Sequence, residues 1–156
     1  MAKLVFDELG KRFYETGVSN AVLYPQADDG SYPKGVAWNG ITAANESPSG
    51  AESNDQYADN IVYLSLTGAE KFEGTIEAFS SPAEFDECDG MKELSKGLTV
   101  SQQTRKPFGF AYKSILGNDI KGNDYGYKLH IWYGCKAAPS ERSHSTVNDS
   151  PEPQNP

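Results

Sequence analysis

Few residues of this chain have the types and the spacing that catalysis requires. A nucleophile–base pair needs a Ser or Cys beside a His, and the two histidines are His130 and His144. His130 alternates with Lys128 and Trp132 on one face of a predicted strand, whereas His144 lies in a polar tail. There is no Gly-x-Ser-x-Gly turn to expose a nucleophile. The sequence therefore predicts no hydrolytic triad.

Two groups of oxygen-bearing side chains have a composition that could form a chemical site. Glu84 and Glu87 share one side of a short predicted helix, and glycosidases use paired carboxylates, but acids in a first helical turn are favoured by the helix dipole alone. Asp119, Asn123 and Asp124 could present oxygens to calcium, but their spacing misses the EF-hand pattern and favours turns. We therefore predict no catalytic, cofactor-binding or metal site, and a protein that is not an enzyme.

The cysteines and the N-terminus bear on the cellular compartment. Cys88 and Cys135 lack the spacing of metal ligands. The first apolar run is three residues long and ends at Asp7, which does not fit a signal peptide, and no segment approaches the ~20 apolar residues of a membrane helix. The expectation is a soluble protein made in a cytoplasm, with two small buried thiols rather than a disulfide.

The elements that would have to position any site are mostly strands. Residues 108–134 predict a long antiparallel hairpin, because Phe108, Phe110 and Tyr112 alternate on one strand and Tyr125 to Tyr133 alternate on the next. The turn between them is rich in Gly, Asn and Asp, which tolerate positive φ. Such a hairpin is framework, and it directs the search toward assembly. Further strands are predicted at residues 21–24, 35–42, 61–66 (a central strand), 72–79 and 98–100.

One short helix is predicted after Ser81. Ser81 suits the N-cap, Pro82 the first helical position and Glu84 the third, from which its side chain can reach back to the cap. Gly90 is the expected stop. Phe85 and Cys88, three residues apart, would share the buried face of the helix.

Two segments lack the pattern of a packed element. Residues 43–60 hold almost no large apolar group, so we predict a long early loop, either mobile or used for interaction. Residues 139–156 hold four prolines and no aromatic residue, which predicts a disordered tail. The expected organisation is one β domain over residues 1–138, followed by this tail.

Negative charge is concentrated in the middle of the chain. Between Gly35 and Met91 there are eleven acids and one base, Lys71, so this stretch carries −10 and the remainder +2, which sums to the net −8. A protein that grips nucleic acid must neutralise phosphates with Lys and Arg. The distribution predicts repulsion of DNA over much of the surface, and the default explanation for it is an ordinary solvated acidic face that aids solubility.

Several segments carry a resemblance to a known family. They are GVAWNGIT at 35–42, YADNI at 57–61, GTIEAF at 74–79, PAEF at 82–85, ECDG at 87–90, QTRKPFGF at 103–110, LGND at 116–119 and YGYKLH at 125–130. In this order and spacing they resemble the major tail protein, or tail tube protein, of long-tailed siphophages and of prophages in Gram-positive bacteria. The similarity covers roughly residues 1–150.

The resemblance implies a β-sandwich- or barrel-like domain, six copies of which close into a ring. Stacked rings would form the virion tail tube, assembled in the host cytoplasm, with tape-measure and tail terminator proteins as partners and no membrane involved. DNA would pass through without specific binding. A long loop would reach the neighbouring ring, and acids would line the lumen or an interface. The loop residues implied are Asn45, Glu46, Glu52, Asp55, Tyr57 and Asp59, and the lumen or interface acids are Glu70, Glu73 and Glu77.

The chain departs from the family at its C-terminus. Similar proteins continue beyond residues 149–152 with strand-forming sequence, so the resemblance implies either a truncated prophage remnant or a different C-terminal end. If final strands are missing, a sheet edge is left open, which would affect tube assembly. The alternative function is a monomeric β-sandwich module that binds a carbohydrate or a protein. Its platform would be Trp38, Tyr57, Trp132 or Tyr133, because aromatic faces stack on sugars.

Overall fold

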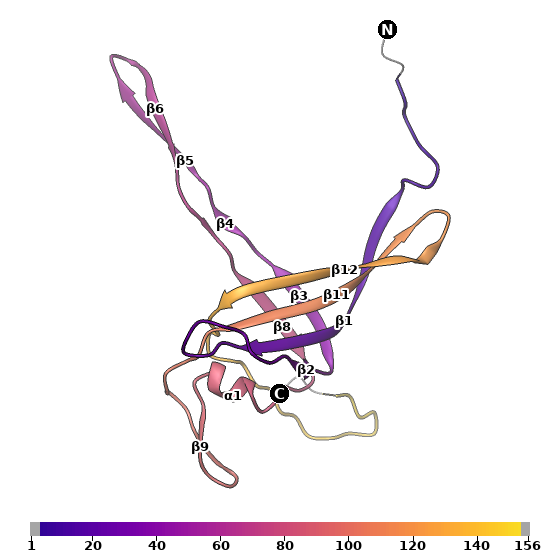
Figure 1. Ribbon diagram of the computed structural model, residues 1–156, viewed down its shortest axis with the longest axis vertical. Coiled ribbons are helices and arrows are strands. Elements are labelled where there is room, and N and C mark those ends of the chain that lie inside the picture. The colour runs from indigo at the N-terminus through magenta and orange to yellow at the C-terminus, as the bar shows by residue number, and fades with distance from the viewer. Residues whose placement is uncertain (1–3, 154–156) are drawn as a thin grey trace. The chain divides into compact units, whose positions relative to one another are not determined.

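The computed structural model describes residues 4–153, which form two compact units (Figure 1). The first unit combines Met1–Thr42 with Ala78–Pro156, and the second is Ala43–Glu77. Strands dominate both units, and the helix among the described residues is a single turn. The predicted fold class, mainly β with one short helix, is confirmed, and the set of open sheets is consistent with a β-sandwich-like fold.

A four-stranded antiparallel sheet is the framework of the first unit. Its strand order is β12-β11-β1-β2, so the predicted hairpin lies at one edge and a strand of three residues at the other. The ladder of the hairpin pairs Phe110 with Trp132 and Leu116 with Gly126, which confirms the prediction for residues 108–134. The strands are β1 (Phe13–Pro25), β2 (Val36–Trp38), β11 (Phe108–Asn118) and β12 (Gly122–Cys135).

Strand β1 is much longer than the predicted strand at residues 21–24. It pairs with β11 from Phe13 to Pro25, with two register shifts that bracket Gly17 and Asn20. Both residues have positive φ, 69° and 54°, which is the backbone conformation of a bulge. These bulges explain why the alternation of side chains is broken before Ala21, so that the pattern indicated only the last part of the strand.

The core lies on one face of this sheet and is aromatic. Phe110 and Leu23 are fully buried, and Phe108 and Tyr112 share that face of β11. The ring of Trp38 lies 4.8 Å from that of Phe85 and 5.6 Å from that of Phe110, between ring centroids. Burial of these side chains removes apolar area from water and so stabilises the unit.

The helix α1 (Phe85–Cys88) covers part of this core. Phe85 and Cys88 are buried as predicted, and Gly90 follows with a φ of 75°, which confirms the expected stop. The predicted capping by Ser81 is wrong, because Glu84 is the N-cap and makes no side-chain cap bond. Pro82 and Ala83 instead accept the amides of residues 85 and 86, so a turn occupies the start of the expected helix.

The rest of the first unit is hairpin and loop. The predicted strand at residues 98–100 is confirmed as β10 (Leu98–Val100), which pairs with β9 (Lys92–Ser95), a strand that was not predicted. Residues 139–153 form no helix or strand, and the predicted disorder of residues 154–156 lies outside the described residues.

Both thiols are free, and burial raises the pKa of Cys88 to about 11. No described helix has the length and apolarity to span a membrane.

The second unit, Ala43–Glu77, is a long two-stranded ribbon that we call the arm (Figure 1). The predicted loop at residues 43–60 is therefore wrong. Its Ser, Asn and Asp residues favour loops, but pairing with the return strand overrides this local preference. Successive strand pairs build the arm: β3 (Ile41–Glu46) with β8 (Gly74–Ala78), β4 (Ser49–Gly50) with β7 (Glu70–Lys71), and β5 (Ser53–Ala58) with β6 (Ile61–Thr67).

Two further strand predictions need correction. Residues 35–42 form two strands rather than one, because Asn39 and Gly40 make a turn in which Gly40 has a φ of 80°. Residues 61–66 form β6, but the strand is not central. Its large apolar side chains are 40–67% exposed, since β6 pairs with β5 alone.

Candidate assembly surface

The outer part of the arm carries apolar side chains that its own strands do not cover. Leu64 lies opposite Gln56, and Leu66 lies opposite Asn54, so these leucines share their face with two amides. The other face carries Ser53, Asp55 and Ser65, with the Ser53 and Ser65 hydroxyls in contact and Ser53 donating to Asp55 at 3.4 Å. It also carries Tyr57 opposite Val62, because the register shifts between Gln56 and Tyr57. We define the arm patch as the exposed apolar residues on both faces, Tyr57, Val62, Tyr63, Leu64 and Leu66.

The tip of the arm is a tight turn. Asp59 and Asn60 have φ values of 52° and 62°, the left-handed conformation that a two-residue hairpin turn requires. Asx residues adopt it more readily than others. The turn fixes the register of β5 against β6, and so places the arm patch.

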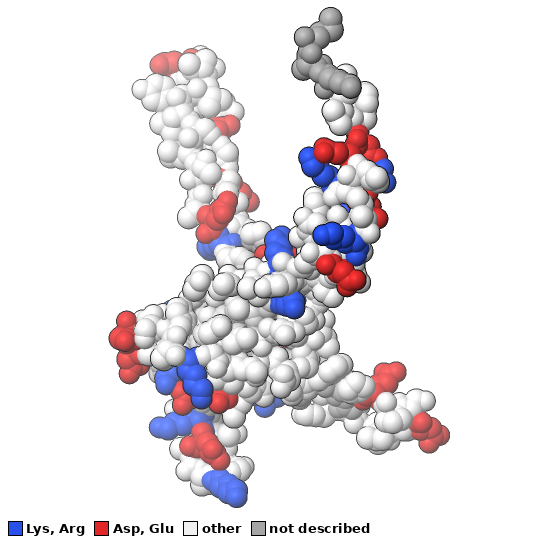
Figure 2. Space-filling model, turned by 45° about the vertical axis from the view of Figure 1, so that its right-hand side comes forward, with Lys and Arg blue, Asp and Glu red and all other residues white. Residues whose placement is uncertain are grey.

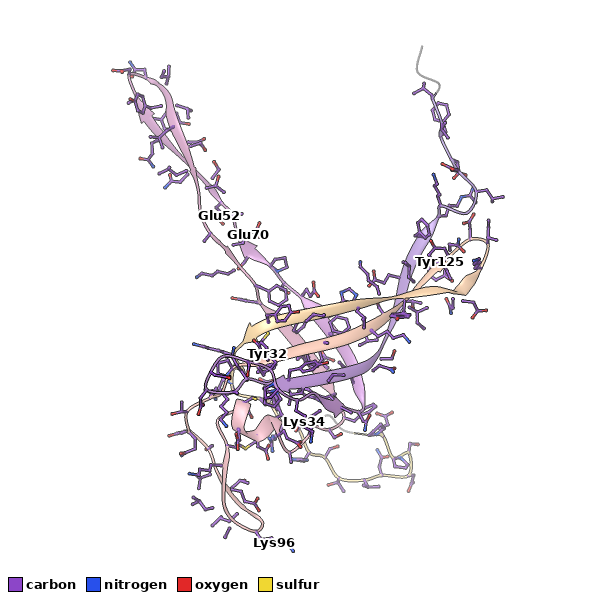
Figure 3. All side chains as sticks on the ribbon, viewed as in Figure 1. Tyr32, Lys34, Glu52, Glu70, Lys96 and Tyr125 are labelled. Carbon is purple, nitrogen blue, oxygen red and sulfur yellow. The ribbon has the colours of Figure 1, made fainter. Side chains whose placement is uncertain are left out.

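The structure places all nine predicted site residues on the arm, and all nine are exposed. The implied loop residues lie mainly on the outgoing strands, and the implied lumen acids lie on the return strands. Glu70 belongs to β7 and Glu77 to β8, while Glu73 accepts the amide of Ser47 through its backbone carbonyl at 2.7 Å. Figure 3 shows Glu52 and Glu70 on the two segments of the ribbon. The two sets thus lie on the same two-stranded ribbon.

The arm is strongly acidic. It holds seven acids and one base, Lys71, which gives −6 of the net −8. Figure 2 shows the red carboxylates spaced along it. In a water-filled channel or at an interface, such a surface repels phosphates and attracts cationic groups.

A second exposed surface, on β12, was not predicted as a site. Tyr127, Leu129, Ile131 and Tyr133 point away from the buried Trp132 and are 51–73% exposed; we call them the β12 patch. The alternation on β12 was visible in the sequence, but both faces contain apolar groups. The pattern therefore could not tell which face the core covers.

Lys113 is the one charged residue on this face of the β11–β12 hairpin. It pairs with Leu129 across the ladder, and its Nζ lies 4.7 Å from the centroid of the Tyr127 ring. An ammonium over an aromatic face gains a cation–π interaction. If a partner covered this face, the partner would have to present an anion to Lys113, because a buried unpaired charge is costly.

On the other face of the sheet, Glu15, Ser114 and His130 meet, although they are far apart in sequence. The Ser114 hydroxyl donates to Glu15 Oε1 at 2.6 Å and lies 3.0 Å from His130 Nε2. Glu15 Oε1 lies 2.8 Å from that same nitrogen, and Lys128 donates to the other carboxylate oxygen at 3.1 Å. In a hydrolytic triad the acid binds the second ring nitrogen, and Ser114 here is buried. This arrangement links three strands and does not match a triad.

The network predicts a pH dependence of stability. Hydrogen bonds from Ser114, Lys128 and His130 lower the pKa of Glu15 from its ordinary 4.5 to about 2. The stabilisation is therefore complete above pH 4.5 and is lost as the pH falls toward 2. We expect Glu15→Gln to flatten the pH dependence of unfolding in this window, measured by urea unfolding at several pH values. Glu52→Gln removes the same charge elsewhere and is the control; an unchanged slope in Glu15→Gln would contradict the assignment.

The other chemical candidates are engaged in structural contacts. Glu87 pairs with Lys106 at 2.6 Å, Asp119 accepts the amide of Gly10 at 3.1 Å, and Asn123 accepts the Tyr14 hydroxyl at 2.8 Å. Among the described residues, no three His, Cys, Asp or Glu side chains gather closely enough to hold a metal ion.

The structure does not present the aromatic platform that was predicted for the alternative function, a carbohydrate- or protein-binding module. Trp38 and Trp132 are 6% and 7% exposed, and the Trp38 Nε1 donates to the Ser80 carbonyl at 2.7 Å. Both rings belong to the core and would have to leave it to stack on a ligand. Tyr57 and Tyr133 are exposed, but they belong to the arm patch and the β12 patch respectively.

Comparison with family models, with curated proteins and with solved structures finds no match for this chain.

Proposed function

We propose that the chain is a structural subunit that assembles with copies of itself into stacked rings, the tail tube of a long-tailed phage. The observation that carries the proposal is the arm, a strand-paired ribbon whose large apolar residues are exposed in the single chain. An exposed apolar strand pair is an aggregation hazard unless a partner covers it. Repeated docking of identical subunits is a regular way to cover such a surface.

Three further points support this function. The β12 patch is a second uncovered apolar surface, so each copy has more than one place at which another can bind. The acidic arm, at −6, suits a protein beside which DNA must pass without sticking. The sequence resemblance adds the ring of six copies and the location in a virion tail.

Electron microscopy of the purified chain in negative stain tests the proposal. At high protein concentration and moderate salt we expect hollow rings, or tubes with a central channel. Small monomeric particles over the whole concentration range would contradict it. Retention of duplex DNA by the assembled protein at low salt would contradict the passage role.

A further inference from the structure

We propose that the turn formed by Asn39 and Gly40 is a site of spontaneous backbone modification, at which the asparagine is converted to aspartate or to β-linked aspartate (isoaspartate). Both residues are exposed, and they connect β2 to β3. The product carries one more negative charge, just before the arm begins at Ala43. The inference concerns the chemistry of one turn of the first unit, so it does not depend on the proposed function.

The reaction needs water and no other partner. The backbone nitrogen of Gly40 attacks Cγ of Asn39, and the new N–Cγ bond replaces the Cγ–Nδ2 bond. The side-chain nitrogen leaves as ammonia and takes the proton of the Gly40 nitrogen. Water then opens the cyclic imide. Addition of water at Cγ gives aspartate, whereas addition at the main-chain carbonyl of Asn39 gives isoaspartate, whose backbone contains one extra methylene.

Gly40 is the residue type that permits this attack. A side chain on the residue after an asparagine crowds the approach to its nitrogen, and glycine has none. Among the asparagines of the chain, Asn39 alone is followed by glycine. The turn also requires the glycine, because Gly40 has a φ of 80°, at which another residue would be strained. The reactive pair is therefore part of the fold.

The reacting groups are not held by other contacts. Residues 4–153 provide no hydrogen-bond partner for the Asn39 side chain or for the Gly40 amide. The turn lines a surface groove of about 470 Å³, to which Ser19 and Asn20 also contribute. The groove leaves room for the Asn39 side chain to rotate and for water to enter. An amide nitrogen without a hydrogen bond is also available for attack.

The structure restrains two other asparagines that lie in turns. Asn118 is buried, and its Oδ1 accepts the amide of Lys121 at 2.7 Å. Its Nδ2 donates to the Gly10 carbonyl at 3.1 Å. Asn123 accepts the hydroxyl of Tyr14 at 2.8 Å. Both asparagines are followed by aspartate, whose side chain crowds the next nitrogen. Sequence and structure thus agree in selecting Asn39.

An isoaspartate at this position would disturb contacts on both sides of the turn. Before the turn, the buried Trp38 donates from Nε1 to the Ser80 carbonyl at 2.7 Å. After it, the Gly40 carbonyl accepts the amide of Phe79 at 2.9 Å. An extra methylene lengthens the backbone between these two contacts, whose partners are neighbours in sequence. The isoaspartate form should therefore be less stable than the aspartate form, which has the same charge and a normal backbone.

Ageing of the full-length chain tests the site. The wild-type protein is incubated under native conditions and digested with trypsin, which releases residues 35–71 as one fragment. Tandem mass spectrometry then measures conversion at each asparagine of this fragment: Asn39, Asn45, Asn54 and Asn60. We expect conversion at Asn39 to be on the order of tenfold faster than at the others, because only its neighbour lacks a side chain. The rate should rise with pH, since the deprotonated nitrogen is the attacking form.

Two variants separate the reaction from its consequences. Asn39→Gln keeps an exposed amide but would have to close a larger ring, so this variant should keep its charge on ageing. Asn39→Asp has the new charge without the extra methylene. The aged wild-type fraction is isolated by anion exchange, and methylation by an isoaspartate-specific carboxyl methyltransferase measures its isoaspartate content. We expect this fraction to melt a few degrees below the Asn39→Asp variant.

Several results would overturn the proposal. Equal conversion at all four asparagines of the fragment would remove the special role of the turn, as would conversion that occurs only in urea. Gain of charge by Asn39→Gln at the wild-type rate would place the reaction elsewhere. An isoaspartate-containing fraction that melts together with Asn39→Asp would contradict the predicted disturbance at Trp38. Assembly is not a readout here, so each of these failures leaves the proposed function standing.

Discussion

Removal of Ser53–Thr67 from the arm is expected to abolish rings and tubes while leaving the melting temperature nearly unchanged. The deletion takes away β5, β6 and the arm patch. The cut ends already lie together, because the Gly68 amide donates to the Glu52 carbonyl at 3.0 Å. An Asn-Gly pair can therefore join them in a two-residue turn. The aromatic core lies in the other unit, which keeps its sequence intact.

The matched control places the same turn at the native tip. Asp59→Asn with Asn60→Gly preserves the left-handed turn and every residue of the arm patch, so this variant should assemble like the wild-type chain. Electron microscopy and a thermal melt of both variants decide the matter. Tubes formed by the shortened chain would show that the arm patch has no part in assembly.

Phe110→Ala is expected to lower the free energy of unfolding by about 3–5 kcal/mol, the usual cost of removing a buried phenyl ring and leaving a cavity. Phe110 is fully buried, and its ring centroid lies 5.3 Å from that of Trp132 and 5.6 Å from that of Trp38. Small domains have only 5–15 kcal/mol in total. The variant should therefore melt many degrees earlier, and a fraction should be unfolded at 37 °C.

The comparison for this variant is Leu98→Ala on β10, where the side chain is about half exposed. Its cost should stay below about 1 kcal/mol, because little apolar surface is lost from the interior. Chemical denaturation with fluorescence of the two tryptophans measures both. A cost for Phe110→Ala as small as that for Leu98→Ala would mean that the core is not organised around the β11 ring.

The sequence predicted best where burial and periodicity agree. On β11 the large residues Phe108, Phe110 and Tyr112 occupy one face, with Gly109 and Ala111 on the other, so alternation and coverage give the same answer. Gly90 likewise identified the end of α1, because a positive φ has few alternatives to glycine. These features depend on neighbours in the chain.

The arm could not be predicted, because its strands are stabilised by pairing rather than by local preference. Ser53–Ala58 contains no β-branched residue, and only its pairing partner β6 makes it a strand. The apolar run of β6 has the composition of a buried strand, but composition indicates only that its side chains favour burial. Whether that cover comes from the same chain or from a copy is not contained in the pattern.

The contacts of Glu15 could not be predicted from the sequence for a different reason. Its partners Ser114, Lys128 and His130 lie on β11 and β12, so their meeting depends on the register of three strands. The bulges at Gly17 and Asn20 shift that register, and the sequence pattern does not predict how many bulges the strand has.

The pairing of β1 with β11 also sets the order in which the chain can fold. Phe13 pairs with Asn118, so nearly the whole chain must leave the ribosome before the central ladder can close. The outer part of the arm can form earlier, because β5 and β6 are joined by a two-residue turn and a hairpin forms within about 1–10 microseconds. For part of its synthesis the nascent chain would thus display a finished apolar ribbon while Trp38 and Leu23 still lack their partners. The long-range pairing of β1 with β11 thus leaves the apolar side chains of the arm exposed before the first unit has folded.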